Sequence, residues 1–174
     1  MTEDRVGLTQ VYTGTGKGKT TATLGLAFRA SGQGLKVIFI QFVKGRGSCG
    51  EHIAAKRSGL FEIVHLNTRD HFDQQEDAVK KTVQQTLKLA ADTISGGKYD
   101  MVILDEIFIA LRLGQITQEQ ITDLIRIKPP QLELILSGRY APASITGMVD
   151  LVSEVECLKH PKDKGVPPRR GIEF

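Results

Sequence analysis

Short apolar runs alternate along the chain with longer segments of helical periodicity. The run Val37–Phe42 is nearly continuous in apolar residues and rich in β-branched and aromatic side chains, which is typical of a strand buried on both faces. Met101–Asp105 has the same character. Similar short runs predict four further strands, over Leu8–Tyr12, Phe61–Leu66, Leu132–Leu136 and Leu151–Val155.

Between these runs, the apolar spacing predicts helices over Lys19–Ser31, Asp73 to about Ile94, and Thr117–Ile127. In the first helix, Leu24, Ala27 and Phe28 share one face, which we expect to be buried. Asp73 is expected to cap the second helix, with Glu76 completing a capping box. Residues 44–50 hold three glycines and are expected to form a loop.

Strands separated by helical stretches of about 10 or more residues require crossover connections. The sheet is therefore expected to be mostly parallel, with about six strands and helices on both faces, in a three-layer α/β fold. A chain of 174 residues fits one domain, and we expect residues 1–174 to form it. Ligands bind beyond the carboxyl ends of strands in such sheets, where Thr13–Thr20, Gln41–Gly50 and Asp105-Glu106 all fall.

Composition narrows the class of protein. The chain is 40% hydrophobic and 25% charged, and its net charge of +3 is too small to imply a nucleic-acid partner. The N-terminus lacks the apolar core of a signal peptide, and no apolar run approaches the ~18 residues of a membrane span. Cys49 and Cys157 match no metal or redox spacing and are expected to be free thiols. We therefore expect a cytoplasmic protein without a membrane segment.

The stretch TGTGKGKTT, from Thr13 to Thr21, predicts a phosphate-binding loop between the first strand and the first helix. Backbone N–H groups exposed by glycines, and the positive end of the following helix, attract phosphate oxygens. Lys19 adds a point charge, and the Thr20 hydroxyl is a ligand type for Mg²⁺. Thr13 stands where the usual G-x-x-x-x-G-K-[ST] pattern has its first glycine.

Two further positions fall at the same edge of the predicted sheet. Asp105 and Glu106 stand where a nucleotide-bound Mg²⁺ finds its second protein contact, although either carboxylate could instead cap the following helix. Arg139 either binds a phosphate or forms a surface salt bridge. His52, His65 and His160 show no metal-ligand spacing.

The sequence leaves the role of the C-terminal tail open. The basic residues of 159–170 either bind phosphate or fold over the site, or else form a solvated tail, and the prolines there argue against regular structure.

Five blocks together resemble one enzyme family. These are YTGTGKGKTT, IQFVKG, VILDE, LSGR and the tail KHPKDKGVPPRRGIEF, in the order and comparable spacing of the ATP:corrinoid adenosyltransferases of the CobA/CobO/BtuR family. The similarity runs from Leu8 to Phe174. The tail discriminates most, because generic P-loop proteins have no reason to carry it.

The resemblance implies a P-loop NTPase (RecA-like) fold and a specific reaction. Such enzymes transfer the 5′-deoxyadenosyl group of ATP to the cobalt of a reduced corrinoid and release triphosphate, with Mg²⁺ or Mn²⁺ as cofactor. Because Co(I) is itself the nucleophile, no general base is required. The implied partners are ATP, the corrinoid and a flavoprotein reductase, and the implied assembly is a homodimer.

Position by position, the resemblance assigns nucleotide binding to Gly14, Thr15, Gly16, Lys17, Gly18, Lys19, Thr20 and Thr21. It places Lys19, Glu106 and Arg139 in catalysis, and Thr20, Glu106 and Asp105 at the metal ion. Gln41 and Lys44 match the tip of the second strand, and Gly50-Glu51 match the family's Gly-Glu pair.

One stretch departs from the family. Well-known members carry Gly-Phe-Thr-Trp before the long helix, whose aromatics press on the corrin ring. Here Arg69 and His71 stand at those two aromatic positions, with Phe72 one place further on. Either Phe72 takes over after a one-residue shift, or His71 faces the corrin, or His71 is a solvent-exposed residue at the start of the helix.

Two other functions remain open from the residues alone. One is a different P-loop ATPase or kinase that forms ADP, which the Asp105-Glu106 pair fits almost as well. The other is an ATP-gated nucleic-acid-binding protein on a RecA-like scaffold, which the low net charge and 6% aromatic content disfavour.

Overall fold

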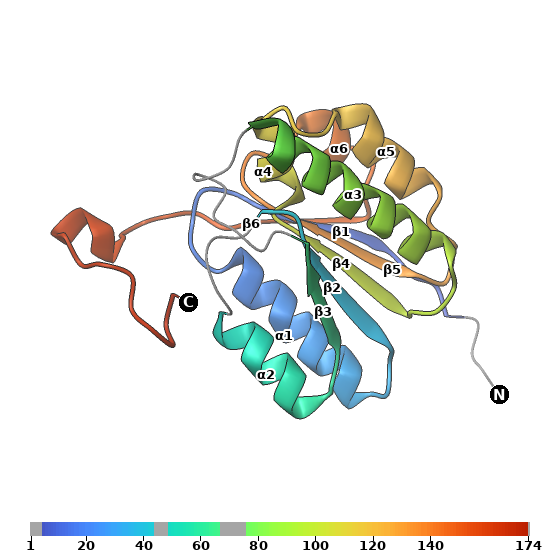
Figure 1. The fold of residues 1–174 in the computed structure, drawn as a ribbon, viewed down its shortest axis with the longest axis horizontal. Coiled ribbons are helices and arrows are strands. Elements are labelled where there is room, and N and C mark those ends of the chain that lie inside the picture. The colour runs from blue at the N-terminus through green and yellow to red at the C-terminus, as the bar shows by residue number, and fades with distance from the viewer. Residues whose placement is uncertain (1–4, 44–48, 67–75, 174) are drawn as a thin grey trace.

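The computed structural model describes residues 5–43, 49–66 and 76–173. Its centre is a sheet of six strands in the order β3-β2-β4-β5-β1-β6, and every strand pairing is parallel (Figure 1). The strands are β1 Thr9–Thr13, β2 Val37–Gln41, β3 Glu62–His65, β4 Met101–Asp105, β5 Glu133–Ser137 and β6 Leu151–Glu154. All six predicted strands are present, each within one or two residues of its expected bounds.

Helices cover both faces of the sheet. Two lie on one face, α1 Lys19–Gly32 and α2 Gly50–Ser58. The opposite face carries α3 Glu76–Ser95, α4 Ile107–Arg112, α5 Gln118–Arg126 and α6 Ala143–Thr146 (Figure 1). No helix in the described part of the chain is both long and apolar enough to cross a bilayer.

Alternating side chains of the central strands fill two separate cores. Phe39 and Ile103 point toward α1, whereas Ile40 and Leu104 point toward the α3 face. Each of these four side chains is fully buried. Strands buried on both faces need no polar alternation, which is why β2 and β4 appear in the sequence as continuous apolar runs.

The structure corrects three expectations. Phe28 was expected on the buried face of α1 but is 65% exposed, because α1 packs on the sheet through Thr23, Ala27 and Ala30. Gly50 begins α2 instead of ending a loop. The tail contains a short 3-10 helix, Pro161–Lys164, because a proline at the first helical position requires no N–H partner.

Other unpredicted elements are short helices. α2, α4 and α6 span nine, six and four residues, too few for a periodic apolar pattern to be visible. The predicted cap of α3 by Asp73 and Glu76 lies outside the described side chains.

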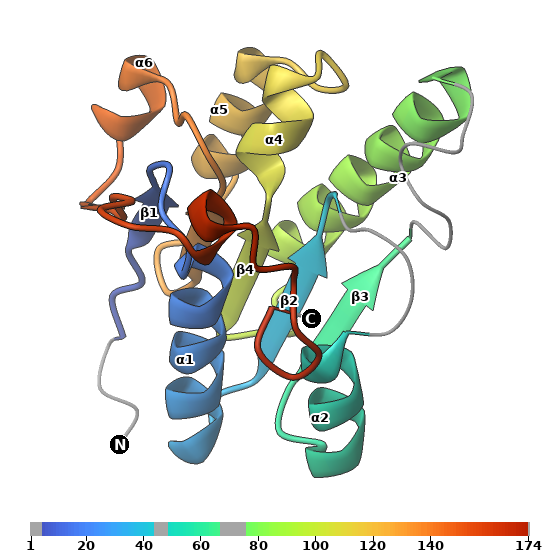
Figure 2. The same cartoon turned by 90° about the vertical axis from the view of Figure 1, so that its left-hand side faces the viewer.

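The carboxyl ends of the strands all meet at one edge of the sheet, where the turn before α1 begins. Figure 2 shows the C-terminal segment, in red, passing in front of the start of α1 and ending near α2. Residues from both ends of the chain therefore meet at this edge, which is where parallel α/β sheets bind ligands.

Candidate nucleotide-binding site

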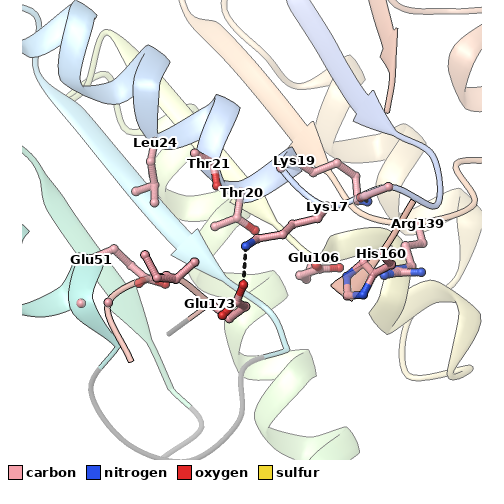
Figure 3. Close-up of a pocket in the computed structure, with 15 residues that line it drawn as sticks. Lys17, Lys19, Thr20, Thr21, Leu24, Glu51, Glu106, Arg139, His160 and Glu173 are labelled. Carbon is pink, nitrogen blue, oxygen red and sulfur yellow. Dashed lines mark hydrogen bonds and ion pairs between the residues drawn. The ribbon is translucent and has the colours of Figure 1, made fainter. Parts of the chain in front are cut away.

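A pocket of about 490 Å³ opens at the carboxyl edge of the sheet. Its walls come from the loop before α1, the starts of α1 and α2, the tips of β4 and β5, and the C-terminal tail (Figure 3). The lining residues are Gly16, Lys17, Gly18, Lys19, Thr20, Thr21, Leu24, Gly50, Glu51, Glu106, Arg139, His160, Gly171, Ile172 and Glu173.

Each of the three glycines in the loop is required at its position for a different structural reason. Gly14 has φ +99°, and a Cβ there would lie 2.4 Å from the carbonyl oxygen of Val155. Gly16 donates its N–H to the same carbonyl at 2.7 Å, which leaves no room for a side chain. Gly18 has open space around it but a φ of +122°, which glycine adopts readily. The alternating glycines thus let the loop pack beneath the chain that follows β6.

Lys19 lies in the centre of the loop. Its ammonium donates to the carbonyl oxygens of Gly14 at 2.8 Å and Gly16 at 2.7 Å, and the residue is 5% exposed. Burial lowers the pKa of Lys19 and the nearby Arg139 guanidinium lowers it further, whereas Glu106 and Asp105 act in the opposite direction. The phosphate loop therefore holds the Lys19 side chain in place, and Lys19 contributes its positive charge to the wall of the pocket.

Asp105 and Glu106 are adjacent in sequence but occupy different environments. Asp105 is 1% exposed and accepts hydrogen bonds from the hydroxyls of Thr20 at 3.1 Å and Ser137 at 2.5 Å. Asp105 therefore holds Thr20 in position without itself lining the pocket, whereas Glu106 does line it. A hydroxyl and two carboxylates are hard oxygen donors, the type that Mg²⁺ prefers.

Glu106 reaches the pocket through an unusual backbone conformation. Its φ of 58° and ψ of 25° are left-handed, and its N–H donates to the Ser137 hydroxyl at 3.2 Å. A non-glycine residue in this region carries backbone strain of about 1–3 kcal/mol, and such strain clusters at functional sites. In the described ranges of the chain, no three His, Cys, Asp or Glu side chains gather to hold a metal ion by themselves.

Arg139 is positioned by the turn after β5. Gly138 has φ +142° and packs its backbone on Phe108, where a Cβ would lie 2.9 Å from the Phe108 Cβ. The Thr13 hydroxyl accepts the N–H of Ala141 at 3.0 Å, which ties this turn to the end of β1. Thr13, the departure from the usual loop pattern, thus makes a contact that a glycine could not. Arg139 and His160 both line the pocket (Figure 3).

The C-terminal tail forms a further part of the pocket wall. Lys17 forms an ion pair with Glu173 at 2.7 Å (Figure 3). Glu173 also pairs with Arg169 at 3.1 Å. The end of the tail therefore folds over the site, whereas the basic residues of 159–170 are exposed except for the half-buried His160, which lines the pocket. Lys17 is a loop lysine that phosphate oxygens would attract, so Glu173 occupies a position where it competes with them.

This arrangement predicts how the tail responds to acid. Hydrogen bonds from Arg169 and then Lys17 lower the pKa of Glu173 to about 2, from its ordinary value of 4.5. Because the folded-state pKa is lowered, the contribution of these pairs is complete above pH 4.5 and is lost as the pH falls toward 2. We expect an NMR titration of the Glu173 carboxyl to give a midpoint near 2.

The same titration has matched variants. Arg169→Ala should raise the Glu173 midpoint more than Lys17→Ala does, since Arg169 contributes the larger effect. A wild-type midpoint near 4.5 would show that the tail does not dock on the loop.

The predicted site residues divide into three groups. Gly16 through Thr21, Glu106 and Arg139 line the pocket together. Gly14, Thr15 and Asp105 do not line it, although Gly14 and Asp105 contact residues that do. Lys44, His71 and Phe72 lie outside the described residues. His160 and Glu173 line the pocket but were not predicted as site residues, and their signal was the resemblance of the tail.

The fold and this loop define a class of protein. The sheet resembles two solved structures at low sequence identity, the flagellar accessory protein FlaH from Methanocaldococcus jannaschii and the KaiC-like protein PH0186 from Pyrococcus horikoshii. The TM-scores are 0.57 and 0.53, at 12% and 19% identity, over 86% and 87% of this chain and 71% and 72% of those chains. The chain has the P-loop NTPase fold, as predicted.

Sequence comparison is more specific. The family described as ATP:corrinoid adenosyltransferase BtuR/CobO/CobP matches residues 5–174. The chain is 34% identical to the corrinoid adenosyltransferase of Escherichia coli K12, over 99% of this chain and 88% of that protein. It is 31% identical to the corrinoid adenosyltransferase of Pseudomonas aeruginosa, over 98% and 85%. This chain belongs to the ATP:corrinoid adenosyltransferase family, which confirms the resemblance found in the sequence.

Proposed function

We propose that the protein transfers the 5′-deoxyadenosyl group of ATP to the Co(I) centre of a reduced corrinoid and releases triphosphate. The observation that carries the proposal is the family match across residues 5–174, which includes both the phosphate loop and the tail that meet in the pocket. Either complete cobalamin or an earlier corrinoid precursor fits the proposal as acceptor.

The loop is suited to a triphosphate that leaves intact. Co(I) donates an electron pair to C5′, the bond from C5′ to the phosphate oxygen breaks, and that bond's electrons leave with the triphosphate. Cobalt is thereby oxidised to Co(III), and no proton is transferred. Lys17, Lys19 and Arg139 line one pocket and can stabilise the charge on the leaving chain.

The oxygen donors of the pocket fit a divalent cation. Thr20 and Glu106 would hold Mg²⁺ or Mn²⁺ beside the phosphates, with Asp105 fixing the Thr20 hydroxyl from behind. The bound ion would supply positive charge that neutralises the triphosphate. The protein's remaining tasks are to align C5′ with cobalt and to exclude water.

Two partners belong to the same proposal. A reductase, of the flavoprotein class by resemblance, would supply the Co(I) state. The second partner is another copy of this chain, because a homodimer is the proposed assembly.

The corrin contact is a separate part of the proposal. Phe72 or His71 would face the corrin.

The test is a direct assay of both products. Purified protein is mixed with Mg·ATP and chemically reduced cob(I)alamin, without oxygen and in the dark, while the corrin absorbance is followed and the phosphate product is identified. We expect a light-sensitive alkylcobalamin spectrum and triphosphate in equal amounts. ADP and inorganic phosphate without a spectral change would contradict the proposal and favour an ATPase, a reaction that the Thr20–Asp105 pair also suits.

A further inference from the structure

A chain of hydrogen bonds runs from the start of α2 to the carboxylate behind Thr20. The ring of His52 accepts the backbone N–H of Cys49 on Nδ1 at 3.2 Å, in a capping box at the first turn of the helix. Its Nε2 lies 2.6 Å from Oε1 of Gln41, at the tip of β2. The Gln41 amide in turn donates from Nε2 to Oδ2 of Asp105 at 3.2 Å.

The geometry assigns a direction to each of these bonds. An ionised Asp105 carboxylate only accepts hydrogen bonds, so the Gln41 NH₂ group must face it and the Gln41 carbonyl oxygen must face His52. His52 therefore donates from Nε2. Its Nδ1 accepts from Cys49, so the ring is the neutral Nε2–H tautomer.

The surroundings hold this chain in place. Gln41 and Asp105 are directly opposite each other in adjacent strands, and they are 2% and 1% exposed. The other neighbour of Gln41 in the sheet is His65, whose ring centroid lies 4.6 Å from that of His52. Asp105 orients the NH₂ end of the Gln41 amide, and His52 holds the carbonyl end. Without His52, the carbonyl end loses this hydrogen bond and the amide is fixed less firmly against Asp105.

We propose that His52 is a positioning residue for the metal-binding edge of the pocket, acting through Gln41 on Asp105. Asp105 also accepts from Thr20 and Ser137, and a fixed Gln41 amide is a further donor that helps to orient the carboxylate toward the Thr20 hydroxyl. The inference rests on the proposed function in one respect, namely that Thr20 and Glu106 hold the cation of the nucleotide complex. His52 itself does not line the pocket.

Metal affinity measured without corrinoid tests the inference. Mn²⁺ is titrated into protein saturated with ATP, and free Mn²⁺ is counted by electron paramagnetic resonance. We expect His52→Ala to raise the Mn²⁺ Kd about tenfold, as loss of an outer-shell partner does at other metal sites. Binding of metal-free ATP should change less than twofold, because the phosphate loop itself is intact.

Two variants separate positioning from general damage. His52→Gln keeps a donor near the place of Nε2 and should recover an affinity within about threefold of wild type. His65→Ala removes the neighbouring ring but no link of the chain, and should bind Mn²⁺ like wild type. In wild-type protein, the ¹⁵N spectrum of the histidine rings should give His52 as the Nε2–H tautomer.

Three results would overturn the inference. These are equal Mn²⁺ affinity in wild type and His52→Ala, an equal loss of metal-free ATP binding in His52→Ala, or an Nδ1–H tautomer in the wild-type spectrum. Failure of the proposed function looks different. In that case wild type binds Mn·ATP and His52→Ala binds it more weakly, yet the corrinoid assay yields ADP.

Discussion

Replacing Lys19 by Ala is expected to abolish measurable ATP binding and to lower kcat/KM by about 10²–10³-fold or more. The Lys19 ammonium lies 2.7 to 2.8 Å from two loop carbonyls, and the residue is 5% exposed. Its charge therefore acts with little screening by water, on phosphates that the loop brings close. The substitution also leaves the carbonyls of Gly14 and Gly16 without this donor, so the loop loses shape as well as charge. Isothermal titration with Mg·ATP measures the loss.

Lys17→Ala is the matched control for that substitution. Lys17 is on the same loop, but its side chain is 44% exposed and is already paired with Glu173. We expect a reduction of about tenfold or less in ATP affinity, since exposed charges are screened. Unchanged ATP affinity in Lys19→Ala, or an equal loss in both variants, would show that the buried ammonium has no special role.

Gly14→Ala is expected to damage both stability and nucleotide binding. The new Cβ would lie 2.4 Å from the Val155 carbonyl oxygen, at a φ of +99° that alanine adopts only with strain. We expect a loss of about 2–4 kcal/mol in the free energy of unfolding, from strain and overpacking together. The chain after β6 must also move away from the loop, which weakens ATP binding. Urea denaturation and ATP titration measure the two effects.

Gly25→Ala gives a control with the same chemical change. Gly25 lies within α1 with no atom within 4 Å of an added Cβ and no positive φ. Alanine should be neutral or should stabilise the helix by up to about 1 kcal/mol. Comparable losses in the two variants would mean that the close approach of Val155 is not what requires Gly14.

The sheet could be predicted from the sequence because its central strands are buried on both faces. Val37 to Gln41 is buried at every position, so the apolar run alone marked a strand. The face that a helix turns toward the sheet could not be predicted in this way, because it depends on how the two elements pack in the folded protein. Phe28 has helical spacing from Leu24, yet α1 rests on the sheet through its small residues, and the large ring is left exposed.

The candidate site was predictable where local sequence determines local geometry. The glycines and Lys19 of the loop from Thr13 to Thr21 determine its backbone shape, and Gly16 through Thr21 form one wall of the pocket. The different environments of Asp105 and Glu106 follow from a left-handed residue at the strand tip, which no local pattern indicated. Glu173 reaches the pocket, and His52 reaches Gln41, from segments distant in the sequence, so only the folded chain brings them there.

The position of β6 at one edge of the sheet connects the loop beside the pocket to a strand that has a single neighbour. β6 pairs with β1 alone, and its end exchanges hydrogen bonds with the loop, from Val155 N–H to Thr13 and from Gly16 N–H to Val155. Edge segments open in local unfolding events at a lower free energy than central strands do. Amide hydrogens at Gly16 and Val155 should therefore exchange with solvent in one cooperative step. A nucleotide that stabilises the loop is expected to slow this exchange at the edge strand, even though β6 does not line the pocket.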